Sequence, residues 1–253
     1  MGDPVGYRLE DGVAWLVIDR PEARNAVNRA VADGLWDGFR RFEADHDAAV
    51  LVLTGAGETF CAGADLKEMA ALGTTVPPRD MAPQLGRNLQ VTKPVIAAVN
   101  GPAFGGGFLL AQMCDLCVAG TSAQFAITEA RWGRGAPWAA PLPWLVPPRV
   151  AMELLLTGEL VDAQRAYEVG LVNRVVPDPE LRSEAGRLAR RIAGNAPLSV
   201  RAAKAMVQAS AGRALDEAVE EGWRLFEPVY LSEDAQEGPR AFVERRPPVW
   251  KGR

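Results

Sequence analysis

The chain has 253 residues, of which 48% are hydrophobic and 24% are charged, a balance typical of a soluble globular protein with a sizeable core. Its net charge of −4 argues against nucleic acid or an anionic membrane as a partner. The sequence has no basic segment followed by an apolar run and no apolar stretch long enough to cross a bilayer, so we expect a cytoplasmic protein.

Continuous β-branched and aliphatic runs predict strands that are buried on both faces of a sheet. The predicted strands are 13–18, 49–54, 94–100, 115–119, 124–126 and 171–176. A helical pattern covers 28–42, and glycine-containing turns open further helices after 49–54 and 94–100. This alternation predicts an α/β core built from ββα or βαβ units.

The last third of the chain is predicted to be helical. The predicted helices are 179–195, 197–211, 215–226 and one that starts near Ser232. Asn195-Ala196-Pro197 stops one helix and starts the next. We therefore expect two parts, a core at 1–195 and a helical region at 196–253, whose apolar helix positions need burial.

The reactive side chains exclude several kinds of chemistry. His46 is the only histidine and lies between two aspartates, which disfavours a Ser-His-Asp or Cys-His mechanism. The three cysteines, Cys61, Cys114 and Cys117, have no second pair or histidine cluster beside them, so no metal site is predicted. Acid–base chemistry is therefore expected from carboxylates.

A glycine-rich turn is the most informative segment. Gly105-Gly106-Gly107 follows a buried strand and opens a helix. Glycines let the backbone approach a ligand closely, and the free N–H groups of the helix start favour an oxyanion. The spacing matches neither the dinucleotide fingerprint nor the P-loop, but a purely structural role in strand–helix packing stays open.

A second turn of the same kind lies at Thr59–Met69, where small residues precede an acidic first helical turn. Two such turns can direct their N–H groups at one oxygen. In these segments the sequence resembles the crotonase superfamily, also called the enoyl-CoA hydratase/isomerase family. The resemblance extends over 19–26, 61–66, 93–107, 155–158, 170–173 and 244–250.

The resemblance implies a crotonase-like spiral of ββα units with a helical C-terminal region for trimerisation. It implies an acyl-CoA substrate, a homotrimer or a hexamer made of two trimers, and no cofactor besides the coenzyme A of the substrate. By position, the N–H groups of Ala64 and Gly106 are expected to form an oxyanion hole for a thioester enolate. The expected substrate- and CoA-binding residues are Ala23, Arg24, Ala26, Ala62, Asp65, Leu66, Gly105 and Leu109.

The acid–base residues decide which reaction is expected. Hydratases of the family usually hold water between two glutamates. Glu129 matches one of them and is the predicted catalytic residue, but Leu109 stands at the other position. One carboxylate is enough to move a proton between two carbons, so the sequence favours double-bond isomerisation. A hydratase or dehydratase, and an acyl-CoA binding protein with little catalysis, stay open as alternatives.

The segment after Glu129 departs from the family pattern, because it is short and contains Trp132, Trp138 and Trp144. Tryptophans bury large areas, and we expect Trp144 to pack in the interior. For Trp132 and Trp138, packing and a place in the acyl pocket both stay open.

Overall fold

The computed structural model describes residues 3–73 and 75–253; Met1, Gly2 and Thr74 lie outside this description. Its strands are β1 (Val5–Glu10), β2 (Val13–Ile18), β3 (Val50–Gly55), β4 (Val95–Val99), β5 (Pro102–Phe104), β6 (Leu116–Gly120), β7 (Gln124–Ala126), β8 (Val161–Asp162) and β9 (Arg174–Val176). Its α-helices are α1 (Arg29–Ala44), α2 (Leu66–Ala71), α3 (Gly106–Gln112), α4 (Pro148–Thr157), α5 (Ala163–Glu168), α6 (Leu181–Ala193), α7 (Pro197–Ser210), α8 (Leu215–Tyr230) and α9 (Glu233–Glu244).

Two sheets form the core. The larger has the strand order β1-β2-β3-β4-β6-β9, and all its pairs are parallel except β1 with β2. The smaller has the order β5-β7-β8. Twice, a strand of the larger sheet is followed directly by a strand of the smaller one: β4 by β5, and β6 by β7. The chain therefore winds between the two sheets, as the predicted ββα units require.

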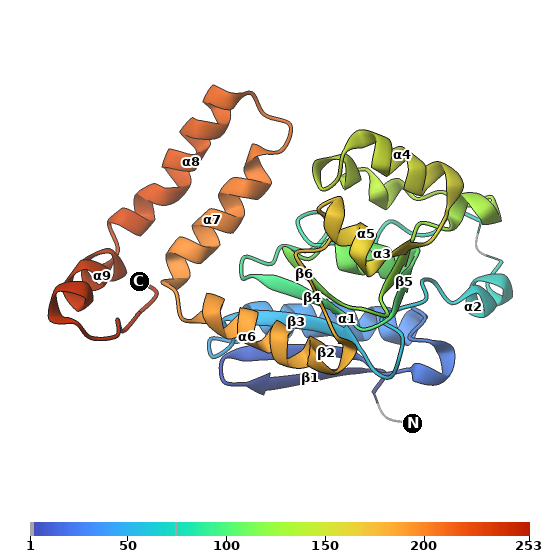
Figure 1. Ribbon diagram of the computed structural model, residues 1–253, viewed down its shortest axis with the longest axis horizontal. Coiled ribbons are helices and arrows are strands. Elements are labelled where there is room, and N and C mark those ends of the chain that lie inside the picture. The colour runs from blue at the N-terminus through green and yellow to red at the C-terminus, as the bar shows by residue number, and fades with distance from the viewer. Residues whose placement is uncertain (1–2, 74) are drawn as a thin grey trace.

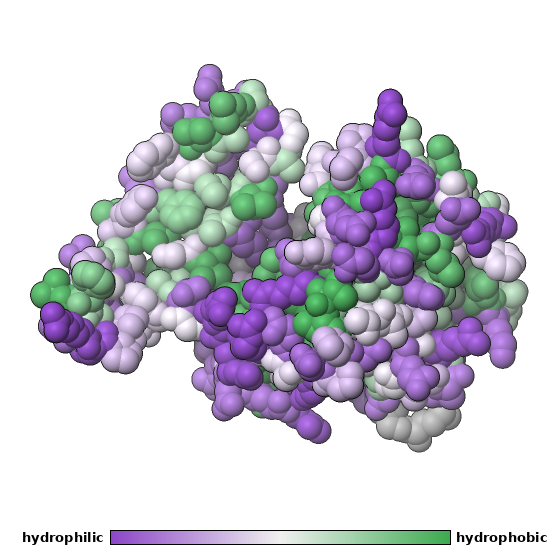
Figure 2. All heavy atoms as spheres, in the orientation of Figure 1, coloured by the Kyte–Doolittle hydropathy of each residue, from purple (hydrophilic) through white to green (hydrophobic). Residues whose placement is uncertain are grey.

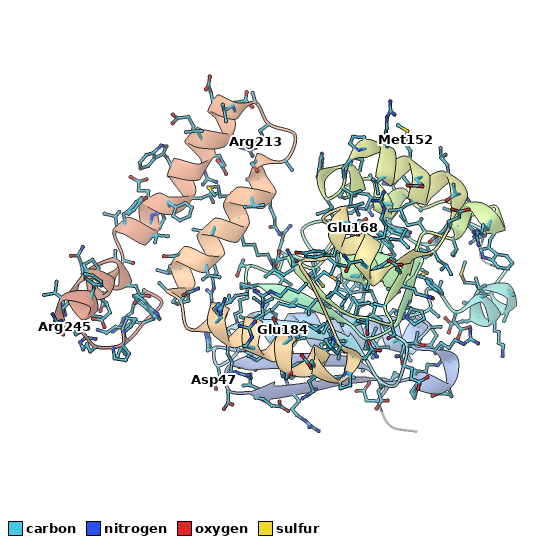
Figure 3. The ribbon with its side chains drawn as sticks, viewed as in Figure 1. Asp47, Met152, Glu168, Glu184, Arg213 and Arg245 are labelled. Carbon is cyan, nitrogen blue, oxygen red and sulfur yellow. The ribbon has the colours of Figure 1, made fainter. Side chains whose placement is uncertain are left out.

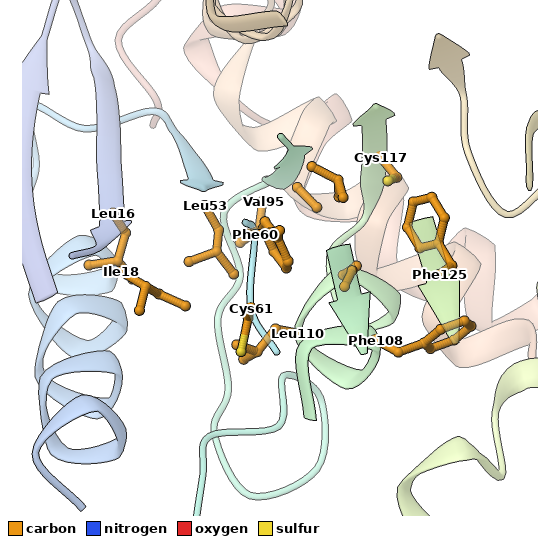
Figure 4. Packing of buried hydrophobic residues seen from close by; sticks show 14 of the residues in the cluster. Leu16, Ile18, Leu53, Phe60, Cys61, Val95, Phe108, Leu110, Cys117 and Phe125 are labelled. Atoms are coloured by element: carbon orange, nitrogen blue, oxygen red, sulfur yellow. The ribbon is translucent and has the colours of Figure 1, made fainter. Parts of the chain in front are cut away.

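Helices cover both faces of the larger sheet (Figure 1). On one face, Leu181, Ala185 and Leu188 of α6 pack on Val13, Trp15 and side chains of the neighbouring strands. On the other, α1 and α3 join a larger cluster that extends to the small sheet. Figure 4 shows Phe108 of α3 beside Phe125 of β7, with ring centroids 6.3 Å apart. Both faces of each continuous apolar strand are therefore buried, which explains the strand's composition.

Local capping sets several helix starts. The Asn28 side chain accepts a hydrogen bond from Val31 N at the start of α1, and Ser232 accepts one from Ala235 N at the start of α9. Both residues are preferred N-caps because their side chains satisfy free N–H groups of the first turn. None of the helices in the described part of the chain is long and apolar enough to cross a membrane.

Helices α7, α8 and α9 form an arm that projects from the core (Figure 1). Arg213 lies in the turn between α7 and α8, and Arg245 follows α9 (Figure 3). A partly buried ion pair ties the arm to the core: Lys204 Nζ of α7 lies 2.8 Å from Asp115 Oδ2, and the same oxygen accepts a hydrogen bond from Val95 N. Asp115 therefore holds both the start of β4 and the root of the arm.

The structure corrects some predicted boundaries. The last strand begins at Arg174 and not at Leu171, because the Leu171 and Val172 amides bond to Ala166 O at the end of α5. Helix α8 continues past the predicted end at 226 to Tyr230, with Pro228 inside it. The predicted stop at 195–197 is confirmed, since α6 ends at Ala193 and α7 begins at Pro197.

Candidate active site

The register of the small sheet brings three turns together. Cys61 forms a parallel bridge with Ala103, and Ala103 pairs in turn with Phe125. The next residues along each segment leave this layer at the same edge. Ala64, Gly106 and Glu129 are among these residues, three or four positions after Cys61, Ala103 and Phe125. Three groups that are far apart in the sequence therefore meet at one place.

The amides of Ala64 and Gly106 are neighbours. A β-carbon built on Gly63 would lie 3.3 Å from Gly106 N, and one built on Gly106 would lie 3.6 Å from Ala64 N. In residues 3–73 and 75–253, neither amide has a hydrogen-bond acceptor. Gly106 is the first residue of α3, so its N–H has no partner within the helix. The two amides can therefore serve one external oxygen.

Glycine at 105 and 107 is required for this close approach. Gly105 has φ +51°, a region that side chains rarely adopt, and Gly63 has φ +97°. A β-carbon on Gly107 would clash with the carbonyl oxygen of Cys61, which accepts a hydrogen bond from Phe104 N. The backbone of α3 thus lies against the neighbouring turn with no room for a side chain.

Glu129 places a carboxyl group next to this pair of amides. A β-carbon on Gly105 would lie 3.0 Å from Glu129 Oε1. The other oxygen, Oε2, is buried and has no hydrogen-bond partner in the described chain. Burial raises the pKa of the Glu129 carboxyl above its ordinary value, partly offset by its own backbone N–H. Such a group is suited to general base and acid chemistry.

Leu109 lies on α3 one turn beyond Gly105, and its N–H donates to Gly105 O at 3.0 Å. It is 7% exposed, yet it belongs to neither of the two large apolar clusters, unlike Phe108 and Leu110 beside it. Because Leu109 follows Gly105 by four positions, it lies on the same face of α3 as Gly105, the face toward Glu129. The position at which the resemblance predicts a second carboxylate in a hydratase is therefore apolar and buried.

The predicted coenzyme A segments lie side by side. Ala62 N donates to Arg24 O, Val27 N donates to Gly63 O, and Asp65 N donates to Val27 O. Residues 23–27 thus run along 62–65, which lead into the Ala64 amide. Arg24 is exposed in a left-handed turn, and its guanidinium has no ion-pair partner among the described residues. Leu66 is 58% exposed at the start of α2.

Asp65 has a structural role that its sequence position did not reveal. Its Oδ1 caps α2 by accepting hydrogen bonds from Lys67 N and Glu68 N, and its Oδ2 lies 2.7 Å from Arg20 Nη1. The Arg20 guanidinium holds the pKa of the Asp65 carboxyl below its ordinary value. The fully buried Asn25 fixes the preceding segment, 56–59, by donating to Ala56 O and Thr59 O.

The tryptophan-rich segment divides into three different environments. Trp138 is partly buried and lies 6.2 Å from Phe108 between ring centroids. Trp132 is 67% exposed. Trp144 is also 67% exposed, so the prediction that it packs in the interior is wrong. The short helical turn at Leu142–Trp144 buries Leu142 and directs the indole to solvent instead.

Sequence reasoning missed one polar residue near this site. Gln112 ends α3 and donates a hydrogen bond from Nε2 to the carbonyl oxygen of Trp138. The signal was present, because Gly105, Leu109 and Gln112 follow the spacing of one helix face. No group of three or more histidine, cysteine or acidic side chains is placed to hold a metal ion in the part of the chain described.

Known proteins are similar to this chain in sequence and in fold. The model of the family described as Enoyl-CoA hydratase/isomerase matches residues 8–253. A carnitinyl-CoA dehydratase from Proteus mirabilis is 40% identical, with 100% of each chain covered. An enoyl-CoA hydratase structure from Mycobacterium marinum is 38% identical with a TM-score of 0.92, and a probable enoyl-CoA hydratase/isomerase from Mycobacterium abscessus is 42% identical with a TM-score of 0.91, each covering 100% of both chains.

Proposed function

Because this chain belongs to the enoyl-CoA hydratase/isomerase family and has its crotonase fold, we propose that it removes water from, or adds water to, the acyl group of a coenzyme A thioester. The observation that carries the proposal is the half-buried Glu129 carboxyl, with one unpartnered oxygen, beside two free backbone amides. Relatives that are named carnitinyl-CoA dehydratase, and that match this chain over 94–100% of both sequences, support water elimination. The sequence alone favours isomerisation.

In the proposed reaction, the thioester oxygen accepts hydrogen bonds from the N–H groups of Ala64 and Gly106. Removal of the C2 proton is difficult unless the resulting enolate oxygen is stabilised, and one such donor contributes about 3–4 kcal/mol. Glu129 takes the C2 proton. The enolate then collapses and expels the 3-hydroxyl group, which leaves as water after it receives that proton.

One carboxylate can perform both proton transfers because the acid formed in the first step is the proton donor in the second. The raised pKa of Glu129 favours this, since a carboxylate whose pKa is nearer the working pH takes the C2 proton more readily and can still return it in the second step. Hydration is the same path in reverse. Leu109 provides no second group to hold water in this scheme.

Double-bond isomerisation is the second candidate, and the apolar Leu109 is the observation that favours it. Glu129 would then move a proton between C2 and C4, and no water would be needed. The same amides would stabilise the same enolate. The two candidate reactions therefore use the same catalytic base. They differ in whether the site holds a water molecule beside C3.

The coenzyme A moiety is proposed to lie along the paired segments 23–27 and 62–65. Ala23, Ala26 and Ala62 are small enough to let it approach the backbone, and Leu66 offers exposed apolar surface. Arg24 is the proposed partner of its phosphates. Asp65 contributes by fixing the start of α2, because its carboxylate is already occupied by Arg20 and two amides.

Residues 196–253 are proposed to join the subunits of a trimer or hexamer. Between α7 and α8 lies an apolar groove of about 390 Å³ that includes Val219, Trp223 and Tyr230. Trp223 is 63% exposed and Val219 is 48% exposed, and Figure 2 shows hydrophobic residues gathered on this arm. Exposed apolar surface of this kind marks an interface.

The reaction is tested with three thioesters: 3-hydroxybutyryl-CoA, crotonyl-CoA and a 3-enoyl-CoA. Ultraviolet absorbance of the conjugated thioester and chromatography of products follow gain, loss or migration of the double bond. Interconversion of the first two supports the proposal. Conversion of the 3-enoyl substrate alone makes the protein an isomerase, and binding of all three without turnover makes it an acyl-CoA binding protein.

A further inference from the structure

Gln112 carries a buried polar atom that the proposed reaction does not use. Its Oε1 has no hydrogen-bond partner, and Gln112 Oε1 and Glu129 Oε2 are the buried side-chain nitrogen or oxygen atoms in that condition across residues 3–73 and 75–253. Leaving a buried acceptor unpaired is costly, so such atoms usually mark where a ligand or a water binds. Glu129 Oε2 already fits this description at the site.

The orientation of the Gln112 amide is fixed by its other end. Nε2 donates to the Trp138 carbonyl oxygen at 3.2 Å. If the amide were reversed, Oε1 would face that carbonyl oxygen and the hydrogen bond would be lost, so the acceptor end is the one left free. Trp138 is itself held by its contact with Phe108, with ring centroids 6.2 Å apart. The Trp138 main chain therefore fixes the Gln112 amide and the direction of its free Oε1.

The position of Gln112 on α3 indicates what it faces. Gly105, Leu109 and Gln112 follow the i, i+4, i+7 spacing of one helix face, and Glu129 lies over Gly105. An α-helix rises about 1.5 Å per residue, which places Leu109 about 4.5 Å and Gln112 about 9 Å beyond the Gly106 amide along the axis. Helical side chains lean toward the N-terminus, which brings the Gln112 amide back toward Leu109.

We infer that Gln112 is a specificity-determining residue that selects acyl groups with a hydroxyl beyond C3. The inference rests on the proposed function, because it takes the thioester oxygen to lie at Gly106. With that oxygen there, C2 and C3 lie beside Leu109, and C4 or C5 comes within reach of Gln112. A hydroxyl at that point donates to Oε1, whereas a plain alkyl chain leaves the acceptor unpaired.

Binding of saturated thioesters tests this without any turnover. Calorimetry compares 4-hydroxybutanoyl-CoA with pentanoyl-CoA and 5-hydroxypentanoyl-CoA with hexanoyl-CoA, since each pair exchanges a hydroxyl for a methyl of similar size. We expect at least one hydroxylated member to bind about tenfold or more tightly than its partner, because a site built to bond a hydroxyl rejects an analogue without it. Gln112→Met, which keeps the length but removes the acceptor, should reduce that preference to about twofold or less.

Gln164→Met is the matched control, because Gln164 lies exposed on α5 and should leave the preference unchanged. Equal affinities within both pairs for the wild type, or a preference that survives in Gln112→Met, would overturn the inference; a water would then satisfy Oε1. These outcomes leave the proposed reaction standing. Failure of every thioester to bind detectably would instead refute the proposed function, and with it this inference.

Discussion

Glu129 lies directly over Gly105: a β-carbon at Gly105 would be 3.0 Å from Glu129 Oε1. Gly105→Ala should therefore displace the carboxyl and also strain a backbone with φ +51°. We expect kcat to fall by about tenfold or more, and the free energy of unfolding to fall by about 1–3 kcal/mol. Gly133→Ala is the control, because Gly133 has φ +63° but nothing within 4 Å of its β-carbon position. Equal losses of activity in both variants would mean that strain, and not contact with Glu129, is responsible.

Glu129→Gln should reduce kcat by about 10²–10⁴-fold, the range associated with loss of a general acid or base. The amide keeps the shape of the acid but cannot take a proton. Affinity for an unreactive acyl-CoA, measured by calorimetry, should stay within about threefold of the wild type because the proposed coenzyme A-binding segments 23–27 and 62–65 are unchanged. A fully active variant would remove Glu129 from the mechanism.

The pH dependence of stability follows from the same carboxyl. Its pKa is raised in the folded state, so the folded protein holds that proton more firmly than the unfolded chain does. The associated stability is present below the unfolded value and is lost as pH rises through the raised folded value. The Tm of Glu129→Gln relative to the wild type should therefore increase over that interval. A Tm difference that stays constant from acid to neutral pH would show that the carboxyl is not perturbed by burial.

Leu109→Glu should introduce or raise hydration of crotonyl-CoA. The new carboxylate would lie on the helix face toward Glu129, where two carboxyl groups can position a water and share a proton if they are close. Leu109 is 7% exposed, so burial should raise the pKa of the new group and reduce stability. Leu109→Met is the size-matched control. A folded Leu109→Glu protein that binds acyl-CoA but hydrates no faster than wild type would exclude Leu109 as the residue that limits hydration.

Trp223→Asp should break the proposed subunit contact of the α7–α8 groove. A charge placed in an apolar interface must be desolvated without a partner, which costs far more than the same change on a free surface. Sedimentation at micromolar concentration should show the wild type as a trimer or hexamer and the variant as a smaller species. Val76→Asp is the control, at a residue that is 83% exposed outside the arm. A wild-type protein that sediments as a monomer would contradict the proposed assembly.

Most of the fold could be predicted because the inner strands of the larger sheet are buried on both faces. These strands then appear as unbroken apolar runs, such as 50–55 and 95–99, which differ clearly from the amphipathic helices around them. The short strands of the small sheet are harder to predict from the sequence. The prediction missed β5, because Pro102–Phe104 is too short for a periodicity and pairs with residues distant in the sequence. It also missed β1, most of whose residues are exposed, and the two-residue β8.

The candidate site also has a part that could be predicted from the sequence and a part that only the structure shows. Ala64, Gly106 and Glu129 were predicted from their positions in segments that resemble the family, and the small sheet brings them together. The pairing of Asp65 with Arg20 and the free oxygen of Gln112 depend on which groups meet in space. Helix-face spacing can place Gln112 beside the site, but it does not give the hydrogen-bond partner of its amide. The exposed indole of Trp144 was mispredicted for the same reason, since a tryptophan's size says nothing about its direction.

The two free N–H groups belong to the main chain and not to side chains. Any residue other than proline supplies an N–H, so no ordinary substitution at Ala64 or Gly106 deletes the donor itself, although it can shift its position. Leu109 and Gln112, in contrast, can each change without rebuilding the backbone. An ancestral enzyme with this framework could therefore exchange one substrate or reaction for another through single mutations, while the most demanding part of its chemistry was inherited with the fold.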